Sequence, residues 1–160
     1  MSSLLSFGSP VKRSLKKSSK KLKLEISSVK PDSKVNYVKQ FVHKMLEIPP
    51  TIRLFHWKTE SYAQHKATDS LMETLNEIVD KYVETLLGKT HVKLDMSDYH
   101  TLHVTNLENV TKLEEYTNSI IDFLIEIHKK LDMEKDVDLL NLRDEMIGDL
   151  NKFKYLLRLK

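Results

Sequence analysis

The stretch that decides the fold is residues 62–88, YAQHKATDSLMETLNEIVDKYVETLLG. Its large apolar side chains recur every three or four residues, the spacing that places them on one face of an α-helix. These residues are Leu71, Leu75, Ile78, Tyr82 and Leu86. Gly88 follows, and glycine commonly ends a helix because it adopts the left-handed backbone conformation without strain. The stretch therefore predicts one long helix from about Tyr62 to Leu87.

The same helix carries four side chains of the kinds that bind metal ions. His65 and Asp69 are four residues apart, as are Asp80 and Glu84, so each pair shares a helix face. Asp69 and Asp80 are about three turns apart, so both pairs lie on roughly the same side. That side lies beside the apolar stripe, which suits a site completed at a subunit interface. The competing interpretation is an ordinary solvated face, because charged residues are mostly exposed.

Imidazole and carboxylate ligands together suit iron, manganese or zinc. Iron oxidation needs oxygen-rich ligands that stabilise the ferric product, and open positions at which an oxidant binds. The residues of this helix meet both needs, whereas the absence of cysteine excludes disulfide, zinc-thiolate and thiol chemistry. Iron is therefore one metal that these residues suit, and manganese, zinc or no metal at all are the alternatives.

Three further segments have apolar residues at helical spacing. The first runs from about Ser33 to Trp57, and an interruption is expected at Pro49-Pro50 because proline removes a backbone donor. The others run from about 106 to 131 and from about 136 to 159. The order is helix, short link, helix, long crossover, helix, short link, helix, with no competing strand pattern. The fold class expected is all-α, a ferritin-like four-helix bundle with a long crossover between helices 2 and 3.

Length and composition fit one domain and a tail. Of the 160 residues 40% are hydrophobic, enough for a single core. No apolar stretch is long enough to span a bilayer, and the N-terminus lacks an apolar segment followed by a small-residue cleavage site. No membrane partner and no secretory signal are therefore expected.

Basic residues gather near the N-terminus. Residues 1–34 hold nine lysines and arginines against two acids, whereas the whole chain carries only +3, so residues 35–160 are mildly acidic. The low apolar content predicts a disordered arm ahead of a folded domain at 35–160. Such an arm would contact the phosphate backbone of DNA without reading its sequence, and a solvated tail or a localisation signal is the alternative. The residues expected to contact nucleic acid are Lys12, Arg13, Lys16, Lys17, Lys20, Lys21 and Lys23.

Residues 56–88 resemble the ferroxidase signature of the Dps proteins, a DNA-protecting, iron-oxidising branch of the ferritin superfamily. That signature has His-Trp at the end of the first helix, then a histidine with an aspartate four residues on. An aspartate and a glutamate four apart follow, before a closing Leu-Gly. The matching residues are His56, Trp57, His65, Asp69, Asp80, Glu84, Leu87 and Gly88. The likeness covers about residues 35–160, but the gap between the two histidines is a few residues shorter here and lacks the usual glycine.

The resemblance implies a function and an assembly. The first three matched ligands, His56, His65 and Asp69, would come from one subunit and the last two from its two-fold partner. A homo-oligomer of at least a dimer is therefore expected, up to the dodecameric shell in which the family stores its mineral. The family oxidises ferrous iron, preferentially with peroxide, and is cytoplasmic or nucleoid-associated. Trp57 would lie beside the site, where it quenches stray radicals or serves as a hydrophobic anchor.

The alternative is a non-catalytic protein on the same scaffold. Similar ferritin-like sequences with a SYAxHKAxD core, which here spans residues 61–69, come from large DNA viruses and phages. Such a protein would be structural or would package nucleic acid, for example within a virion. It would keep the bundle without the ferroxidase chemistry, so the sequence leaves open whether this chain is an enzyme.

Overall fold

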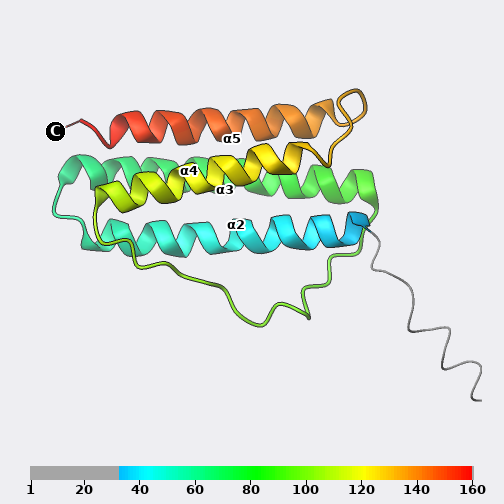
Figure 1. Cartoon of the computed structure of the whole chain (residues 1–160), viewed down its shortest axis with the longest axis horizontal. Helices are drawn as coiled ribbons and strands as arrows, with labels where there is room; N and C mark the ends of the chain where they lie inside the picture. The colour runs from blue at the N-terminus through cyan, green and yellow to red at the C-terminus, as the bar shows by residue number, and fades with distance from the viewer. Residues whose placement is uncertain (1–32, 160) are drawn as a thin grey trace, which may run out of the picture. The chain divides into compact units, whose positions relative to one another are not determined.

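The computed structural model describes residues 33–159 of the chain. This part of the chain contains four α-helices and the segments that connect them (Figure 1). They are α2 (Ser33–Lys58), α3 (Tyr62–Thr90), α4 (Val110–His128) and α5 (Val137–Leu156). No strand occurs within these residues, so the prediction of an all-α fold with four helices is confirmed. The seven residues expected to contact nucleic acid lie outside the described residues, as does nearly all of the predicted arm. None of the helices described is long and apolar enough to cross a membrane.

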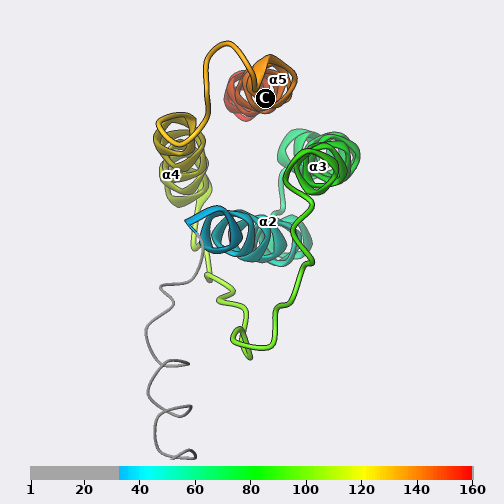
Figure 2. The same ribbon diagram turned by 90° about the vertical axis from the view of Figure 1, so that its right-hand side faces the viewer.

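The helices form a bundle in which neighbours run antiparallel. Seen end-on, their order around the bundle is α2, α3, α5, α4 (Figure 2). At one end Lys89 of α3 binds the carboxylate of Asp138 on α5 at 2.6 Å. At the other end Lys58 of α2 binds Asn106, just ahead of α4, at 2.6 Å. The two helices joined by the crossover, α3 and α4, are therefore parallel and lie diagonally across the bundle.

The crossover, residues 91–109, runs along the outer side of α2 (Figures 1 and 2). Side chains at every fourth position of α2 hold it there, each by one polar contact, because residues four apart share a helix face. The pairs are Lys39 with Asp98 at 2.8 Å, His43 with Thr101 at 3.0 Å, Glu47 with His103 at 3.1 Å and Thr51 with Thr105 at 3.2 Å. The outward face of α2 is therefore covered by the crossover.

All four helices contribute to one apolar core. The five apolar residues that predicted α3 are all buried, so the periodicity identified the core face of that helix correctly. In the part of the core near the start of α2, the ring of Phe41 stacks on that of Tyr82 with centroids 4.3 Å apart. The hydroxyl of Tyr82 lies 2.7 Å from the hydroxyl of Tyr37, so this buried pair satisfies its own polar atoms.

The expected interruption at Pro49-Pro50 is wrong, because α2 continues through both residues to Lys58 (Figure 1). Each proline in a helix interior costs about 3 kcal/mol, since it removes a hydrogen bond and crowds the preceding turn. Burial on both sides of the pair offsets this cost: Ile48 is 2% exposed and Ile52 is 1% exposed. A break here would pull one of these side chains out of the core, so tertiary packing overrides the local preference.

The predicted ends of α3 and α4 also differ from the observed ones. Gly88 lies inside α3, which ends only at Thr90. The residue in the left-handed conformation is His91, with φ of 53°. The helix α4 begins later than predicted because Asn109 caps it, its side chain accepting the backbone N–H of Lys112 at 3.0 Å. Apolar periodicity places a helix well, but caps decide where it ends.

Replacing Pro50 by alanine should stabilise the bundle. Pro50 lies in the interior of α2 and has no N–H to donate to the carbonyl oxygen four residues earlier. Alanine restores that donor, so the free energy of unfolding should rise by about 2–2.5 kcal/mol, the helix cost of proline less the entropy that proline removes from the unfolded chain. Chemical denaturation of both proteins measures the change. A less stable variant would mean that packing of the proline ring outweighs the missing hydrogen bond.

The buried tyrosine pair should make the fold sensitive to high pH. Burial raises the pKa of both Tyr37 and Tyr82 above the ordinary value of 10.0. Above about pH 10 these tyrosines lose their protons in the unfolded chain but keep them in the folded one, so stability is complete below that pH and falls above it, by about 1.4 kcal/mol per pH unit for each tyrosine. In Tyr82→Phe the unfolding free energy should fall less steeply above that pH, by about 1.4 kcal/mol per pH unit less than in the wild type. An unchanged slope would contradict this account.

Candidate metal centre

A tight turn between α2 and α3 positions three of the predicted ligands. Only residues 59–61 separate the two helices. Ser61 caps α3, since its hydroxyl accepts a hydrogen bond from the backbone N–H of Gln64 at 3.4 Å. The hydroxyl of Thr59 donates to the side-chain oxygen of Gln64 at 2.7 Å. These bonds close the turn and set the last turn of α2 against the first turns of α3.

His56, His65 and Asp69, which we call the triad, meet on this hairpin. One ligand atom from each residue lies within 4.8 Å of those of the other two. The Nε2 atom of His56 lies 3.6 Å from Oδ1 of Asp69. The imidazole rings of His56 and His65 stack with centroids 3.8 Å apart. The short turn needs no glycine, because residues 59–61 have no positive φ, and it brings the two histidines into direct contact.

Hydrogen bonds decide which nitrogen of His56 is available to a metal. Its Nδ1 lies 2.9 Å from the hydroxyl oxygen of Thr68 and 3.2 Å from the carbonyl oxygen of His65. The Thr68 hydroxyl donates its single hydrogen to helix carbonyls, at 2.8 Å in the case of His65, and a carbonyl only accepts. Nδ1 must therefore be the donor. In the neutral ring this leaves the lone pair on Nε2, the nitrogen next to Asp69.

His65 has the same arrangement. Its Nδ1 lies 3.4 Å from the carbonyl oxygen of His56, which again only accepts, so the lone pair of His65 is on Nε2. Metal-binding histidines usually donate their other ring N–H to a carbonyl or carboxylate, because this fixes the ring and makes it a better ligand. Both histidines of the triad are thus held in the form that a metal site requires.

The triad is closed on one side and open on the other. His56 is 8% exposed and contacts Thr68, which is fully buried. The side chain of Asp69, in contrast, is 43% exposed. A metal ion at the triad would have helices behind it and an accessible side at Asp69, where solvent, an oxidant or another chain can approach. An open coordination position of this kind distinguishes reactive metal sites from structural ones.

The other two predicted ligands, Asp80 and Glu84, lie away from the triad. Both are exposed on α3, and the helix between Asp69 and Asp80 spans about 16 Å. Within residues 33–159 the triad is the one group of three or more metal-binding side chains that the structure brings together. One chain therefore places three of the five predicted ligands in one site, and Asp80 and Glu84 can join a triad only from a second chain.

Sequence reasoning missed Thr68, the residue that orients His56. A signal was available, because this threonine directly follows buried Ala67 and comes three residues before buried Leu71, on the core side of α3. A buried hydroxyl needs a partner, and His65 and Asp69 are polar side chains close to it on the same helix. The helical spacing alone did not reveal that the partner would come from α2.

A family model and a phage protein are similar to this chain. The model, described as "Family of unknown function (DUF5856)", matches residues 56–157, a range that begins at His56 and includes all five predicted ligands. A protein of Enterobacteria phage T4, described as an uncharacterized 14.6 kDa protein in the mobD-ri intergenic region, is 28% identical over 105 residues. That alignment covers 66% of this chain and 75% of the phage protein. No solved structure matches the chain significantly.

Proposed function

The chain belongs to this family of unknown function, DUF5856, whose model matches more than half of its residues, and we propose from its site that it is a Dps-like, ferritin-like protein that binds and oxidises ferrous iron. The observation that carries the proposal is the triad. It offers two imidazoles, each held by an Nδ1 hydrogen bond, and one half-exposed carboxylate, with their ligand atoms within 4.8 Å of one another.

The ligand types favour iron. Two histidines and one carboxylate with open positions form the ligand set of many non-haem ferrous sites that react with oxidants. Manganese and zinc accept the same donors, and zinc binds such sites more tightly than ferrous iron does. Zinc has no redox chemistry, however, so it would occupy the triad as an inhibitor of the proposed reaction rather than as a participant in it.

A second copy of the chain would complete the site. The triad leaves coordination positions open, and carboxylates such as Asp80 and Glu84 are hard oxygen donors that suit the ferric product. A long crossover between parallel α3 and α4 supports a ferritin-like scaffold, since ferritin-like bundles have one such connection. A two-fold homodimer is the smallest assembly that shares ligands in this way, and it would hold two equivalent sites. A dodecameric shell would be built from such dimers.

Ferrous iron is the substrate of the proposed reaction. Two ferrous ions each give one electron to hydrogen peroxide, its O–O bond breaks, and the two oxygens take up protons to leave as water or hydroxide. The residues of the triad would orient the ions through Nε2 of each histidine and through the Asp69 carboxylate, whose negative charge stabilises the ferric state. Thr68 would not touch the ion. It is a positioning residue, because it acts by holding the ring of His56.

Iron oxidation by the full-length protein tests the proposal. Anaerobic protein that is given a ferrous salt and then hydrogen peroxide should form a ferric species faster than buffer does. Zinc added beforehand should slow the reaction, because it competes for the same nitrogen and oxygen ligands. The proposal fails if the protein oxidises iron no faster than buffer across a range of peroxide concentrations.

Non-specific DNA binding through the basic N-terminal residues is a separate part of the proposal. Affinity for duplex DNA should fall steeply as salt rises, with a log–log slope of about −6 if all seven predicted residues release a counterion. Replacing these seven residues by glutamine in the full-length chain should flatten the slope and remove most of the binding. A titration of labelled DNA at several salt concentrations measures both effects. Binding that is insensitive to salt and to the substitutions would reject this contact.

One observation favours the alternative of a non-catalytic protein, for example a structural protein of a virion. The bonds that orient the two histidines also join α2 to α3 reciprocally, each Nδ1 lying near the other residue's carbonyl oxygen. In this alternative the triad is a clamp on the hairpin. Thermal unfolding with and without added metal separates the two functions. If ferrous iron and zinc fail to raise the melting temperature, while His65→Ala lowers it, the clamp alone explains the triad.

A further inference from the structure

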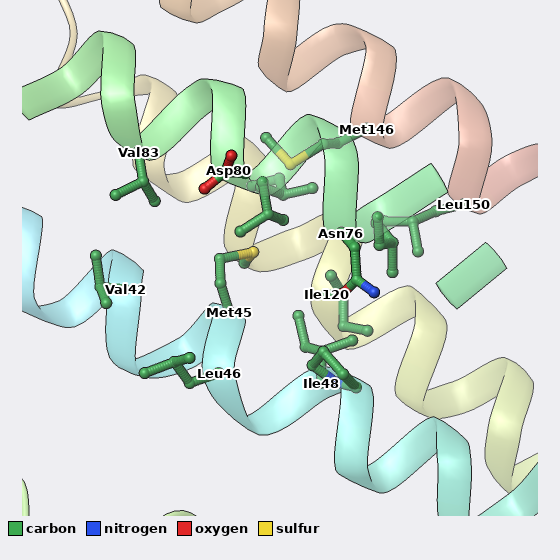
Figure 3. Close-up of a pocket in the computed structure, with 14 residues that line it drawn as sticks. Val42, Met45, Leu46, Ile48, Asn76, Asp80, Val83, Ile120, Met146 and Leu150 are labelled. Carbon is green, nitrogen blue, oxygen red and sulfur yellow. The ribbon is translucent and has the colours of Figure 1, made fainter. Parts of the chain in front are cut away.

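An apolar pocket opens between α2 and α3, around the middle of the hairpin. Its volume is about 270 Å³, and residues of all four helices line it. Figure 3 shows Val42 and Leu46 of α2 beside Asp80 and Val83 of α3, with Met146 of α5 further along. Leu46 is 49% exposed at this opening. Apolar surface that stays open in this way gains contacts when another side chain fills it.

Trp57 has a large apolar side chain that is exposed to solvent. It directly follows His56, is 70% exposed and is the one tryptophan in the chain. Leu46, Arg53 and Trp57 occur at i, i+7 and i+11, so Trp57 shares the flank of α2 that borders the pocket. Tryptophan is enriched among the anchor residues of protein interfaces, because a rigid ring buries much area at little entropic cost.

Two-fold symmetry would bring Trp57 of one copy to the pocket of another. The helices α2 and α3 run antiparallel, and the stacked rings of His56 and His65 fix their register. An axis that crosses the hairpin midway between the triad and Asp80 therefore places Asp80 of a second copy at the triad. The same axis places Trp57 within about one helical turn of Val83, at the edge of the second copy's pocket. Helix side chains lean towards the N-terminus, which carries the indole further in that direction.

Charges on this flank agree with the arrangement. Arg53 is exposed one turn before Trp57, whereas Asp80 and Glu84 are exposed at the pocket end. None of the three is ion-paired within residues 33–159. Two-fold packing sets the basic end of each hairpin against the acidic end of the other, so the attraction occurs twice. The two ends of the flank are therefore complementary to those of a second copy, whereas Glu73 and Glu77, exposed between them, bring like charges towards the axis.

We infer that Trp57 of each copy fills the apolar pocket of a second copy, and that this exchange joins the dimer in which the metal site is completed. The inference rests on the proposed function, because that function requires the two-fold pairing. It adds the residue that joins the two chains and the surface that receives it. The indole ring contacts Val42 and Val83 of the second copy, and its N–H lies within reach of the Asp80 carboxylate, a partner that a buried indole requires.

The fluorescence of this single tryptophan tests the inference directly in the full-length, metal-free protein. In the dimer, identified by sedimentation, Trp57 emission should lie at shorter wavelength and be protected from acrylamide. Dilution to monomer should reverse both effects. Val83→Phe, which fills the mouth of the pocket, should raise the dimer dissociation constant by at least about tenfold, as loss of an anchor does. Val137→Phe, at a half-exposed position on α5, is the matched control and should dimerise normally.

Two outcomes would overturn the inference: a dimer whose Trp57 remains exposed to acrylamide, or a chain that stays monomeric at every concentration. Iron oxidation measured on the same preparations separates this result from the proposed function. Oxidation with an exposed Trp57 would leave the function standing and remove the inference. A buried Trp57 in a dimer that does not oxidise iron would support the inference and contradict the proposed function. Circular dichroism of Val83→Phe shows whether a loss of dimer reflects the pocket or a loss of folding.

Discussion

His65→Ala is expected to slow the peroxide-dependent oxidation of ferrous iron by about a hundredfold or more. Loss of a group that merely supports a metal ligand typically costs 10–100-fold, and His65 is itself one of only three ligands that the chain holds together. The initial rate of ferric formation under anaerobic loading measures the effect. His100→Ala, at an exposed histidine of the crossover, is the matched control and should keep the wild-type rate. Equal rates in the two variants would remove the triad from the reaction.

Asp80→Asn should be comparably slow, although Asp80 lies about 16 Å along the helix from Asp69 of its own chain. The asparagine keeps the size of the side chain and removes its charge, so the fold should be unaffected. A large effect at this distance has a simple explanation only if the carboxylate acts in the site of another chain.

Mixing the two slow variants tests that explanation. In a two-fold dimer each site takes its triad from one chain and Asp80 from the other. A mixed dimer of His65→Ala with Asp80→Asn therefore has one intact site and one doubly damaged site. Random exchange makes half of the dimers mixed, so the mixture should recover about a quarter of the wild-type rate. Absence of recovery after demonstrated subunit exchange would show that the two residues do not serve a shared site.

The helices could be predicted because their apolar residues are periodic and their core faces are wide. Leu71, Leu75 and Ile78 needed no tertiary information to be placed on one buried face. The continuity of α2 through Pro49 and Pro50, in contrast, could not be predicted without tertiary information. The low helix propensity of proline predicts a break at this pair, and only the core contacts on both sides of it keep α2 continuous. Sequence rules for proline are therefore reliable only where little apolar surface depends on the continuation.

The site was predictable along α3 but not across the turn. Helical spacing alone places His65 and Asp69 on one face and sets that face beside the core. The contact with His56 depends on how residues 59–61 close, and that closure follows from the Ser61 cap and a bond between Thr59 and Gln64. These hydrogen bonds belong to the side chains of a short turn, and the spacing of apolar residues does not predict them.

The continuity of α2 through the two prolines and the geometry of the metal site are connected. His56 follows Pro50 by six residues, so an interruption at the prolines would have freed the segment that carries it. Because α2 is continuous, the core contacts of Ile48 and Ile52 also position His56, and the ring needs only Thr68 to complete its orientation. The metal site thus depends on packing well inside the bundle. Destabilising α2 near the prolines should therefore weaken metal binding before it unfolds the protein.

Phe41→Ala should cause the largest loss of stability, about 3–5 kcal/mol, because it removes a fully buried ring and leaves a cavity. Phe41 stacks between Tyr82 at 4.3 Å and Phe123 at 6.3 Å, so one substitution loosens the contacts of α2 with both α3 and α4. Small domains are stable by only about 5–15 kcal/mol, so the variant should unfold at a much lower denaturant concentration. Leu102→Ala, at a side chain 46% exposed in the crossover, should cost about 0.5 kcal/mol or less.

The same variant also separates stability from chemistry. Phe41 lies about 22 Å along α2 from His56, in the half of the bundle opposite the triad. Phe41→Ala should therefore oxidise iron at close to the wild-type rate at temperatures well below its unfolding transition, whereas His65→Ala should be slow while remaining nearly as stable as the wild type. If Phe41→Ala were no less stable than Leu102→Ala, the ring would not be in the core that this fold requires. If it were stable but inactive, the two ends of the bundle would be coupled by more than the continuity of α2.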